Sequence, residues 1–371
     1  MAKKGKDKKD ESALSVSKGV EQPPSVNPTL LKRIRQNRKQ NYSADEYAEK
    51  IIEGNITFLS KAITLVESSR QDHYDEAQKI IDLCLPYSGN SVRLGITGVP
   101  GAGKSSFIET LGKRLCSLNT KLAVLAIDPS SEKSHGSILG DKTRMESLAN
   151  DNNAFIRPSP SAGSLGGVAR KTRESIILCE AAGFDTIFIE TVGVGQSETL
   201  VHSMVDFFLL IMISGAGDEL QGIKRGITEM ADAIAINKAD GANITKAQTA
   251  RVEFQNALHF FPHSKPDWKP EVLTCSAQEA TGIDEVWALV MEYISIAKGN
   301  GYFQEWRQKQ AVYRMHDTIN EAINKSFYKD AEISAMLPEL EDMLQKNRIT
   351  SYSAACKVLN KYFSDKGKGC F

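Results

Sequence analysis

Gly98-Val-Pro-Gly-Ala-Gly-Lys-Ser105 is the most informative segment of this chain. It fits the pattern G-x4-G-K-[ST], follows an apolar run at 92–97, and precedes a helical pattern at 106–118. In this setting the glycines let successive backbone N–H groups converge on phosphate oxygens, and the helix N-terminus favours negative charge. We predict that eight residues here bind a nucleotide: Gly98, Pro100, Gly101, Ala102, Gly103, Lys104, Ser105 and Ser106.

Two side chains of this loop have specific expected roles. Lys104 should reach the β- and γ-phosphates, and the Ser105 hydroxyl should be a ligand of Mg²⁺. The alternative is a glycine-rich turn that binds nothing before a helix. The apolar run before the motif and the helical pattern after it argue for the phosphate-binding interpretation.

Short apolar runs recur along the chain, at 92–97, 122–127, 186–189, 207–213, 233–236 and 272–274. Helical stretches separate them, as expected for strands that are buried on both faces of a parallel sheet. We predict an α/β fold with a doubly wound, mainly parallel sheet and helical extensions at both ends. The expected divisions are a disordered basic tail (1–28), an N-terminal helical region (29–88), a P-loop domain (89–299) and a C-terminal helical dimerisation arm (300–371).

The composition argues against several classes of protein. Lys+Arg and Asp+Glu both number 46, so no net charge favours nucleic acid. The longest apolar run, 207–213, is far shorter than the roughly 20 residues that cross a bilayer. The six cysteines form no CxxC pair, and the six histidines show no metal-ligand spacing. We expect neither nucleic-acid nor membrane partners.

The N-terminal segment differs from the rest in charge. Residues 1–40 contain eleven Lys or Arg against four Asp or Glu. Residues 1–28 lack the apolar core of a secretory signal, and they have acidic residues but no Arg, unlike a mitochondrial presequence. We predict a solvated tail and a cytoplasmic protein, with RNA or partner binding by the tail as the alternative.

A second motif, Asn237-Lys-Ala-Asp240, directly follows the apolar run at 233–236. The Asp240 carboxylate can accept two hydrogen bonds, from N1–H and from the 2-amino group of guanine. Adenine lacks both donors in that arrangement, so ATP would leave the carboxylate unpaired. The stem of Lys238 can lie along the base. We predict guanine recognition by Asn237, Lys238 and Asp240, with the backbone N–H of the Ser276-Ala277 element meeting guanine O6.

Carboxylates of the expected metal site follow other strands. Glu190-Thr-Val-Gly193 stands where many GTPases have D-x-x-G, so we predict Mg²⁺ contact by Glu190 and γ-phosphate contact by the Gly193 N–H. Asp128 and Asp141 are further carboxylates at the same expected edge. For Asp141, N-capping of a helix at 142–149 is an equally good interpretation. Val194 replaces the water-orienting Gln of Ras-like proteins, which predicts slow intrinsic turnover, on the order of 10⁻³–10⁻² s⁻¹.

The chain resembles the MeaB/ArgK-type GTPases, chaperones of adenosylcobalamin-dependent methylmalonyl-CoA mutase. The resemblance is nearly continuous over 90–245. Its segments are LGITGVPGAGKSSFIETL (94–111), DPSS with GSILGDKTRM (128–131 and 136–145), FIRPSPSAGSLGGVAR (155–170), ETVGVGQSET (190–199), GAGDELQGIKRG (215–226) and 237–241. His135 departs from the family, which usually has glycine there.

This resemblance implies roles that spacing alone does not. Lys104, Asp128, Asp141 and Glu190 would form the catalytic neighbourhood, and Ser105, Asp128, Asp141 and Glu190 the Mg²⁺ site. The loop 215–226 would be a switch that communicates with the mutase through Asp218, Glu219, Gln221 and Lys224. The C-terminal helices would form a homodimer. Binding and hydrolysis of GTP to GDP would gate adenosylcobalamin delivery to the mutase and protect or reactivate it, with a cobalamin adenosyltransferase as a further candidate partner.

Three alternatives stay open at this point. The client could be another acyl-CoA mutase, for example one of the isobutyryl-CoA type. A nickel metallochaperone GTPase is disfavoured by the missing Cys/His motif. A nucleotide-dependent kinase of amino acids, linked to transport, is disfavoured by the guanine motif and by the absence of an evident acceptor-binding segment with a general base.

Overall fold

The computed structural model describes residues 42–68, 70–128, 145–160, 165–191, 197–215, 225–259, 265 and 267–365. The chain divides into two compact units, residues 1–43 and residues 44–371. All the helices and strands described below belong to the second unit. The predicted tail at 1–28 lies outside the described residues.

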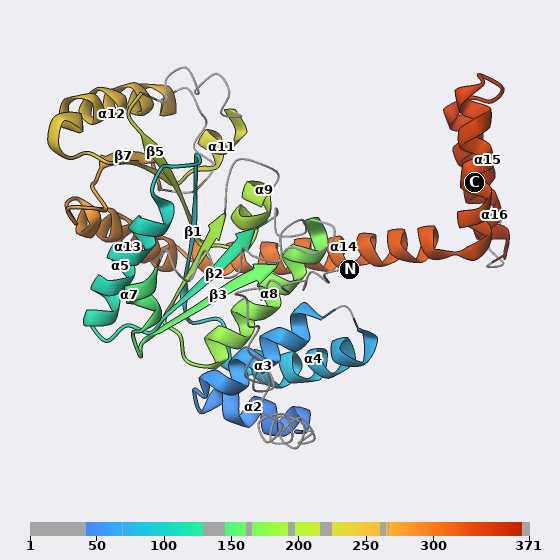
Figure 1. Cartoon of the computed structure of the whole chain (residues 1–371), viewed down its shortest axis with the longest axis horizontal. Coiled ribbons are helices and arrows are strands. Elements are labelled where there is room, and N and C mark those ends of the chain that lie inside the picture. Colours follow the sequence, from blue (N-terminus) through green and yellow to red (C-terminus); the bar gives the residue numbers. More distant parts are fainter. Residues whose placement is uncertain are drawn as a thin grey trace, which may run out of the picture. The chain divides into compact units, whose positions relative to one another are not determined.

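One seven-stranded sheet forms the centre of the second unit, and each strand pairs in parallel with its neighbours (Figure 1). Its order is β3-β2-β4-β1-β5-β6-β7. The strands are β1 (Val92–Gly98), β2 (Leu122–Asp128), β3 (Ala154–Pro160), β4 (Thr186–Thr191), β5 (Phe207–Ile213), β6 (Ala233–Asn237) and β7 (Glu271–Thr274). Because β1 is central and the chain extends the sheet on both sides of it, the sheet is doubly wound. The predicted fold class is confirmed.

Strand β3 is the element that the apolar runs did not predict. It forms one edge of the sheet and pairs only with β2. Phe155 and Ile156 are buried, but Arg157 and Pro158 follow them and end the apolar run. An edge position explains this, because an edge strand tolerates proline and needs fewer buried side chains than a central one.

Helices flank the sheet and precede it. Before β1 come α2 (Ala44–Ile52), α3 (Ile56–Glu67), α4 (Gln71–Cys84) and the short η1 (Leu85–Tyr87). Between the strands lie α5 (Lys104–Ser117), α7 (Glu146–Ala149), α8 (Leu165–Ala181), α9 (Ser197–His202), α11 (Arg225–Met230), η2 (Gly241–Asn243) and α12 (Ile244–Leu258). The buried faces of α2–α4 join the same hydrophobic core as the strands. The N-terminal helices and the sheet therefore share one core.

The C-terminal part consists of four helices: α13 (Ile283–Gly299), α14 (Tyr302–Lys329), α15 (Ala331–Gln345) and α16 (Ser351–Asp365). The last three helices are separated by non-helical residues, at Asp330 and at 346–350. The apolar pattern did not indicate these helix ends. Asp330 caps α15 by accepting hydrogen bonds from the backbone N–H groups of Glu332 and Ile333. Helices α15 and α16 bury a small hydrophobic cluster of their own, separate from the core around the sheet.

The first turns of α14 pack tightly against the sheet. The Arg307 guanidinium donates to both carboxylate oxygens of Asp206 at 2.7 and 2.8 Å, and to the backbone carbonyls of Gly89 and Ser91. The Gln310 amide donates to the Val205 carbonyl at 2.8 Å. These bonds join α14 to the segment before β1 and to the start of β5.

Within the described ranges, no helix is both long and apolar enough to cross a membrane.

Candidate nucleotide-binding site

The loop between β1 and α5 has a backbone path that requires glycine at two positions. A Cβ on Gly98 would lie 2.1 Å from the Ile211 carbonyl oxygen of the neighbouring strand β5. Gly103 has φ of +86°, and a Cβ there would lie 2.6 Å from the side-chain nitrogen of Asn237. The motif glycines therefore bring this loop into direct contact with β5 and with the end of β6.

Lys104 begins α5, and its side chain is buried within the loop. Its ammonium group donates to the backbone carbonyls of Gly98 at 2.8 Å and Val99 at 3.2 Å. Burial lowers the pKa of Lys104, and the charges of Glu190 and Glu198 oppose that shift. A cation held in this way, beside glycine-rich backbone and a helix N-terminus, suits the phosphates of a nucleotide.

Ser105 and Glu190 meet at the carboxyl end of the sheet. The Ser105 hydroxyl donates to a Glu190 carboxylate oxygen at 3.0 Å, and Glu190 is buried near the end of β4. The two residues are 85 positions apart in sequence. A hydroxyl and a carboxylate oxygen so placed are the donor types that hold Mg²⁺ in P-loop proteins, so these residues fit that ion.

Asn237 links the phosphate loop to the predicted base-recognition segments. Its amide nitrogen donates to the Ala102 carbonyl at 2.8 Å, and its amide oxygen accepts from the Ala277 N–H at 3.0 Å. Thr110 of α5 adds a second link by donating to the Ala277 carbonyl at 2.8 Å. Both motifs and the Ser276-Ala277 element are thus joined by direct hydrogen bonds.

Asp240 and Ser276 are also in contact, because the Ser276 hydroxyl donates to a carboxylate oxygen of Asp240. Lys238, which lies between Asn237 and Asp240 in the motif, has an exposed side chain. Its backbone has a positive φ of 60°. The Ala277 N–H, which we expected to meet guanine O6, donates to Asn237 in this structure. The predicted base-binding residues therefore lie together, with their roles toward the base still a prediction.

The remaining predicted residues are placed only in part. Asp128 ends β2, and Glu190 is the penultimate residue of the neighbouring strand β4, so both lie toward the same edge of the sheet. Pro100, Gly101 and Ser106 belong to the phosphate loop and the first turn of α5. Outside the described residues lie His135, Asp141, Gly193, Asp218, Glu219, Gln221 and Lys224.

Glu198 is a residue that the sequence analysis did not single out. It stands in the first turn of α9, is almost fully buried, and its charge acts on Lys104. In the sequence, the only indication of a role for Glu198 is that it is an acidic residue soon after the segment 190–193. In the described part of the chain, no group of three or more His, Cys, Asp or Glu side chains is arranged to hold a metal ion. The Ser105–Glu190 pair is a smaller set and does not count as such a group.

Comparisons with known proteins agree with this geometry. The family model described as "Methylmalonyl Co-A mutase-associated GTPase MeaB" matches residues 59–332. GTPase ArgK of Escherichia coli is 48% identical over 283 residues, which cover 76% of this chain and 86% of that protein. The mitochondrial methylmalonic aciduria type A homolog of Mus musculus is 40% identical over 336 residues, covering 88% of this chain and 81% of that protein.

A solved structure matches as well. The crystal structure of a LAO/AO transport system kinase has a TM-score of 0.70 and 36% sequence identity to this chain. The match covers 85% of this chain and 96% of that one.

Proposed function

The chain belongs to the MeaB family of GTPases, and from this premise we propose that it gates adenosylcobalamin delivery to methylmalonyl-CoA mutase and protects or reactivates that enzyme. The Ser105–Glu190 contact beside Lys104 supports the nucleotide-binding part of the proposal, because it places a hydroxyl, a carboxylate and a cation at the start of α5. The description of the matching family and the name of the mouse relative support methylmalonyl-CoA mutase as the client.

In the proposed nucleotide complex, GTP or GDP lies along the carboxyl edge of the sheet. Backbone N–H groups of the loop 98–106 bind the phosphates, and Lys104 neutralises charge on the β- and γ-phosphates. Asp240 selects guanine. Asn237 binds Ala102 of the phosphate loop and Ala277 of the base-recognition segment, and so fixes the distance between these two parts of the site. Gly193 supplies an N–H to the γ-phosphate.

Magnesium is the implied cofactor, and it would be held by Ser105 and Glu190, with Asp128 and Asp141 in its surroundings. Bound Mg²⁺ would neutralise charge on the phosphate oxygens. The Ser105–Glu190 hydrogen bond holds both side chains beside the start of α5. Hydrolysis is slow, since Val194 cannot orient a water molecule as a glutamine does.

Communication with the mutase is proposed for the loop 215–226, which follows β5 at the nucleotide edge of the sheet. Glycines permit the loop to change conformation, and Asp218, Glu219, Gln221 and Lys224 supply groups that exchange partners between nucleotide states. A cobalamin adenosyltransferase is the proposed source of the cofactor that the GTPase gates.

Homodimer formation is proposed through α14. Val312, Met315, Ile319 and Ile323 are exposed and spaced three or four residues apart, so they follow one face of the helix. Exposed apolar side chains that line a helix face are typical of a contact with another helix. Full-length Ile319→Glu should sediment as a monomer at a concentration where the wild type sediments as a dimer. A monomeric wild type at micromolar concentration would contradict the dimer.

The coupling proposal is tested by GTPase assays of the wild type and Lys224→Ala, each with and without methylmalonyl-CoA mutase. The mutase should stimulate the wild type by about 5–150-fold, the range of typical coupling energies. Lys224→Ala should keep its GTP affinity within a few-fold and lose most of the stimulation. Lys246→Ala removes an exposed charge from α12 near the same sheet edge and should behave as wild type.

Equal stimulation of the wild type and Lys224→Ala would exclude Lys224 from the coupling. No stimulation of the wild type by this mutase would point to another acyl-CoA mutase, to be tested in the same assay. Transfer of the γ-phosphate to an added amino acid such as arginine would instead support the kinase alternative.

A further inference from the structure

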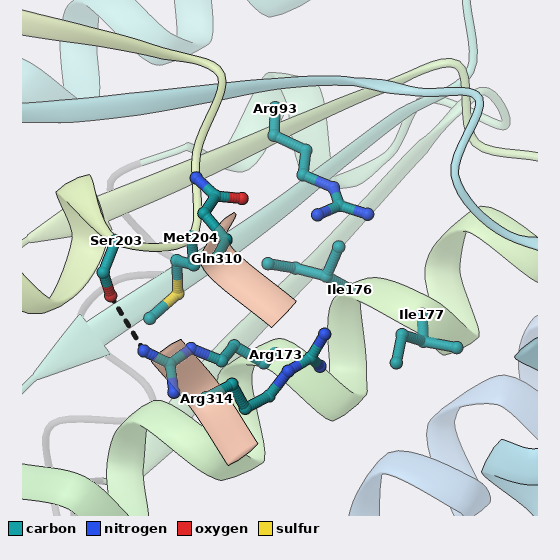
Figure 2. Close-up of a pocket in the computed structure, with 8 residues that line it drawn as sticks. All are labelled: Arg93, Arg173, Ile176, Ile177, Ser203, Met204, Gln310 and Arg314. Carbon is teal, nitrogen blue, oxygen red and sulfur yellow. Dashed lines mark hydrogen bonds between the residues drawn. The ribbon is translucent and has the colours of Figure 1, made fainter. Parts of the chain in front are cut away.

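Figure 2 shows the side chains that line a small cavity. The cavity lies toward the amino ends of the strands, whereas the phosphate loop follows the carboxyl end of β1. Arg93, the second residue of β1, lines it, whereas Gly98 at the other end of β1 opens the phosphate loop. At about 3.3 Å per strand residue, the two sites are roughly 17 Å apart. The cavity is therefore distinct from the predicted nucleotide site.

Four elements contribute to the cavity wall. Arg93 comes from β1, Arg173 from α8, Ser203 from the turn after α9, and Gln310 and Arg314 from α14. In Figure 2, Arg93 enters from one side, and Arg173 and Arg314 lie together on the other. The wall has three guanidinium groups and no carboxylate, while isoleucine and methionine side chains close the apolar part.

The three arginines differ in how they are paired. Arg93 donates to both carboxylate oxygens of Glu180, at 2.8 and 2.9 Å. Arg173 donates to the Ser203 hydroxyl at 2.8 Å and only weakly to Asp317, at 3.4 Å. Arg314 is half-buried and has no hydrogen bond or ion pair with any residue that the structure describes. Among the described residues, its donors are therefore available to another group.

The electrostatics point in the same direction. Burial lowers the pKa of Arg314, and the positive charges of Arg173 and Arg93 lower it further. Glu174 and Glu180 oppose this shift, but they are already bound to Arg170 and Arg93 respectively. An anion beside Arg314 would relieve the repulsion among the three guanidinium groups.

We propose that this cavity is a second anion site, which binds a phosphate group through Arg314 and Arg173. The cavity, of about 30 Å³, is far too small for a nucleotide and is partly open to solvent, so a phosphate would place some of its oxygens inside while the rest of the group stays at the mouth. A phosphate dianion suits the site better than a single carboxylate, because planar guanidinium forks bind its several oxygens and its charge balances more than one arginine. The group is either inorganic phosphate or the terminal phosphate of a small monoester.

The position of the cavity gives such an anion a structural role. Ser203 and Met204 follow α9, whose first turn carries Glu198 close to Lys104. Gln310 and Arg314 belong to α14, which continues into the C-terminal helices. A phosphate bound here would contact α8 and α14 and adjoin the turn after α9, and so would fix the arm relative to the element that follows the nucleotide site.

The proposal is tested by calorimetric titration of protein loaded with Mg²⁺ and guanosine 5′-(β,γ-imido)triphosphate and freed of excess nucleotide. This nucleotide fills the phosphate loop, so added phosphate reports on other sites. Inorganic phosphate and glycerol 3-phosphate are titrated separately. We expect saturable binding to the wild type and at least about tenfold weaker binding to Arg314→Gln, as for loss of a charged hydrogen-bond donor.

Two further variants make the result decisive. Lys309→Gln removes an exposed cation from α14 outside the cavity and should bind phosphate as the wild type does. Arg314→Lys keeps the charge without the planar fork and should bind more weakly than the wild type, which tests the site even where Arg314→Gln folds poorly. Binding of both probes identifies a monoester site, and binding of inorganic phosphate alone identifies a site for the free ion. No saturable binding to the wild type, or equal binding by the wild type and both Arg314 variants, would overturn the proposal.

Discussion

The nucleotide edge of the sheet and the C-terminal arm are built in different ways. At the nucleotide edge, side chains far apart in sequence are joined by buried hydrogen bonds, such as Ser105 to Glu190 and Asn237 to Ala102. The arm beyond Gln310 has few such bonds, exposes apolar side chains along α14, and ends in a small cluster formed by α15 and α16. One region is fixed by contacts across the whole fold, and the other mainly by local packing.

This difference has an energetic consequence. Opening the nucleotide edge requires breaking bonds that cross the central sheet, so its free energy approaches that of global unfolding. Opening the arm requires only the loss of a cluster with five buried side chains. We therefore expect changes in one region to leave the other largely intact, and the following predictions test that separation.

The largest effect is expected from Lys104→Ala. Removing the cation buried in the phosphate loop should lower GTP turnover on the order of a thousandfold, as for the loss of an important transition-state donor. The folded arm should keep its wild-type amide protection. Lys113→Ala, an exposed position on the same helix α5, is the matched control. Near-normal turnover by Lys104→Ala would remove the phosphate-loop assignment.

The converse change is Ile333→Ala in the arm cluster. Ile333 is 1% exposed, and truncating a buried isoleucine costs about 2–5 kcal/mol. Amide exchange across α15 and α16 should accelerate, whereas GTP turnover should stay within about twofold of the wild type. Glu339→Ala, on the exposed side of α15, should change neither. A large loss of turnover in Ile333→Ala would show that the two regions are energetically coupled.

Asp240→Asn should alter nucleotide choice without affecting the arm. An asparagine amide can donate to the 2-oxo group of xanthine, but it cannot accept both guanine hydrogen bonds. We expect GTP affinity to fall by about ten- to a hundredfold and xanthosine triphosphate affinity to rise. Competition binding with both nucleotides measures the change, and Asp284→Asn, an exposed acid beside α5, serves as control. An unchanged preference for GTP would refute the base-recognition assignment.

The smallest effect concerns His202, which lies where the first turns of α14 pack on the sheet. Its ring contacts Phe208 of the sheet and Trp306 of α14, and burial lowers its pKa, with Lys265 adding to the shift. The unfolded chain therefore takes up a proton more readily than the native one, so stability is full above the ordinary histidine pKa of 6.5 and falls as the pH drops below it. His202→Phe keeps an aromatic ring and should reduce this fall by up to about 1 kcal/mol per pH unit. Unfolding titrations between pH 7 and 5 test it, and identical slopes would contradict it.

Much of the fold could be predicted because a buried parallel strand leaves a clear apolar run. The segment 207–213 is such a run, and it forms β5 over the same residues. The edge strand β3 has no such run, since only two of its side chains are buried before Arg157. The sequence analysis predicted a helical arm at 300–371 without internal boundaries, because successive amphipathic helices repeat the same apolar spacing and do not mark the helix ends at Asp330 and 346–350.

The site could be predicted where one short motif carries the chemistry. Spacing alone identifies Lys104 and Asp240 as candidates, but it does not show that Asn237 binds the Ala102 carbonyl across 135 residues. The arginine cavity left no signal at all, because Arg93, Arg173 and Arg314 lie on three different elements. Contacts of this kind arise from topology, which brings distant segments to one place.

The bonds of Arg307 limit how this protein can be divided or recombined. A chain cut at the glycine-rich break near residue 300 would retain Asp206, which is 1% exposed, but would lose the guanidinium that binds both its oxygens. The Arg93 N–H would still donate to Asp206, but the carbonyls of Gly89 and Ser91 would also lose their bonds to Arg307, so the cut should lower the stability of the remaining domain. In engineering terms, the transferable GTPase module therefore extends through the first three turns of α14, and a graft that exchanges arms between relatives should place its junction after Gln310.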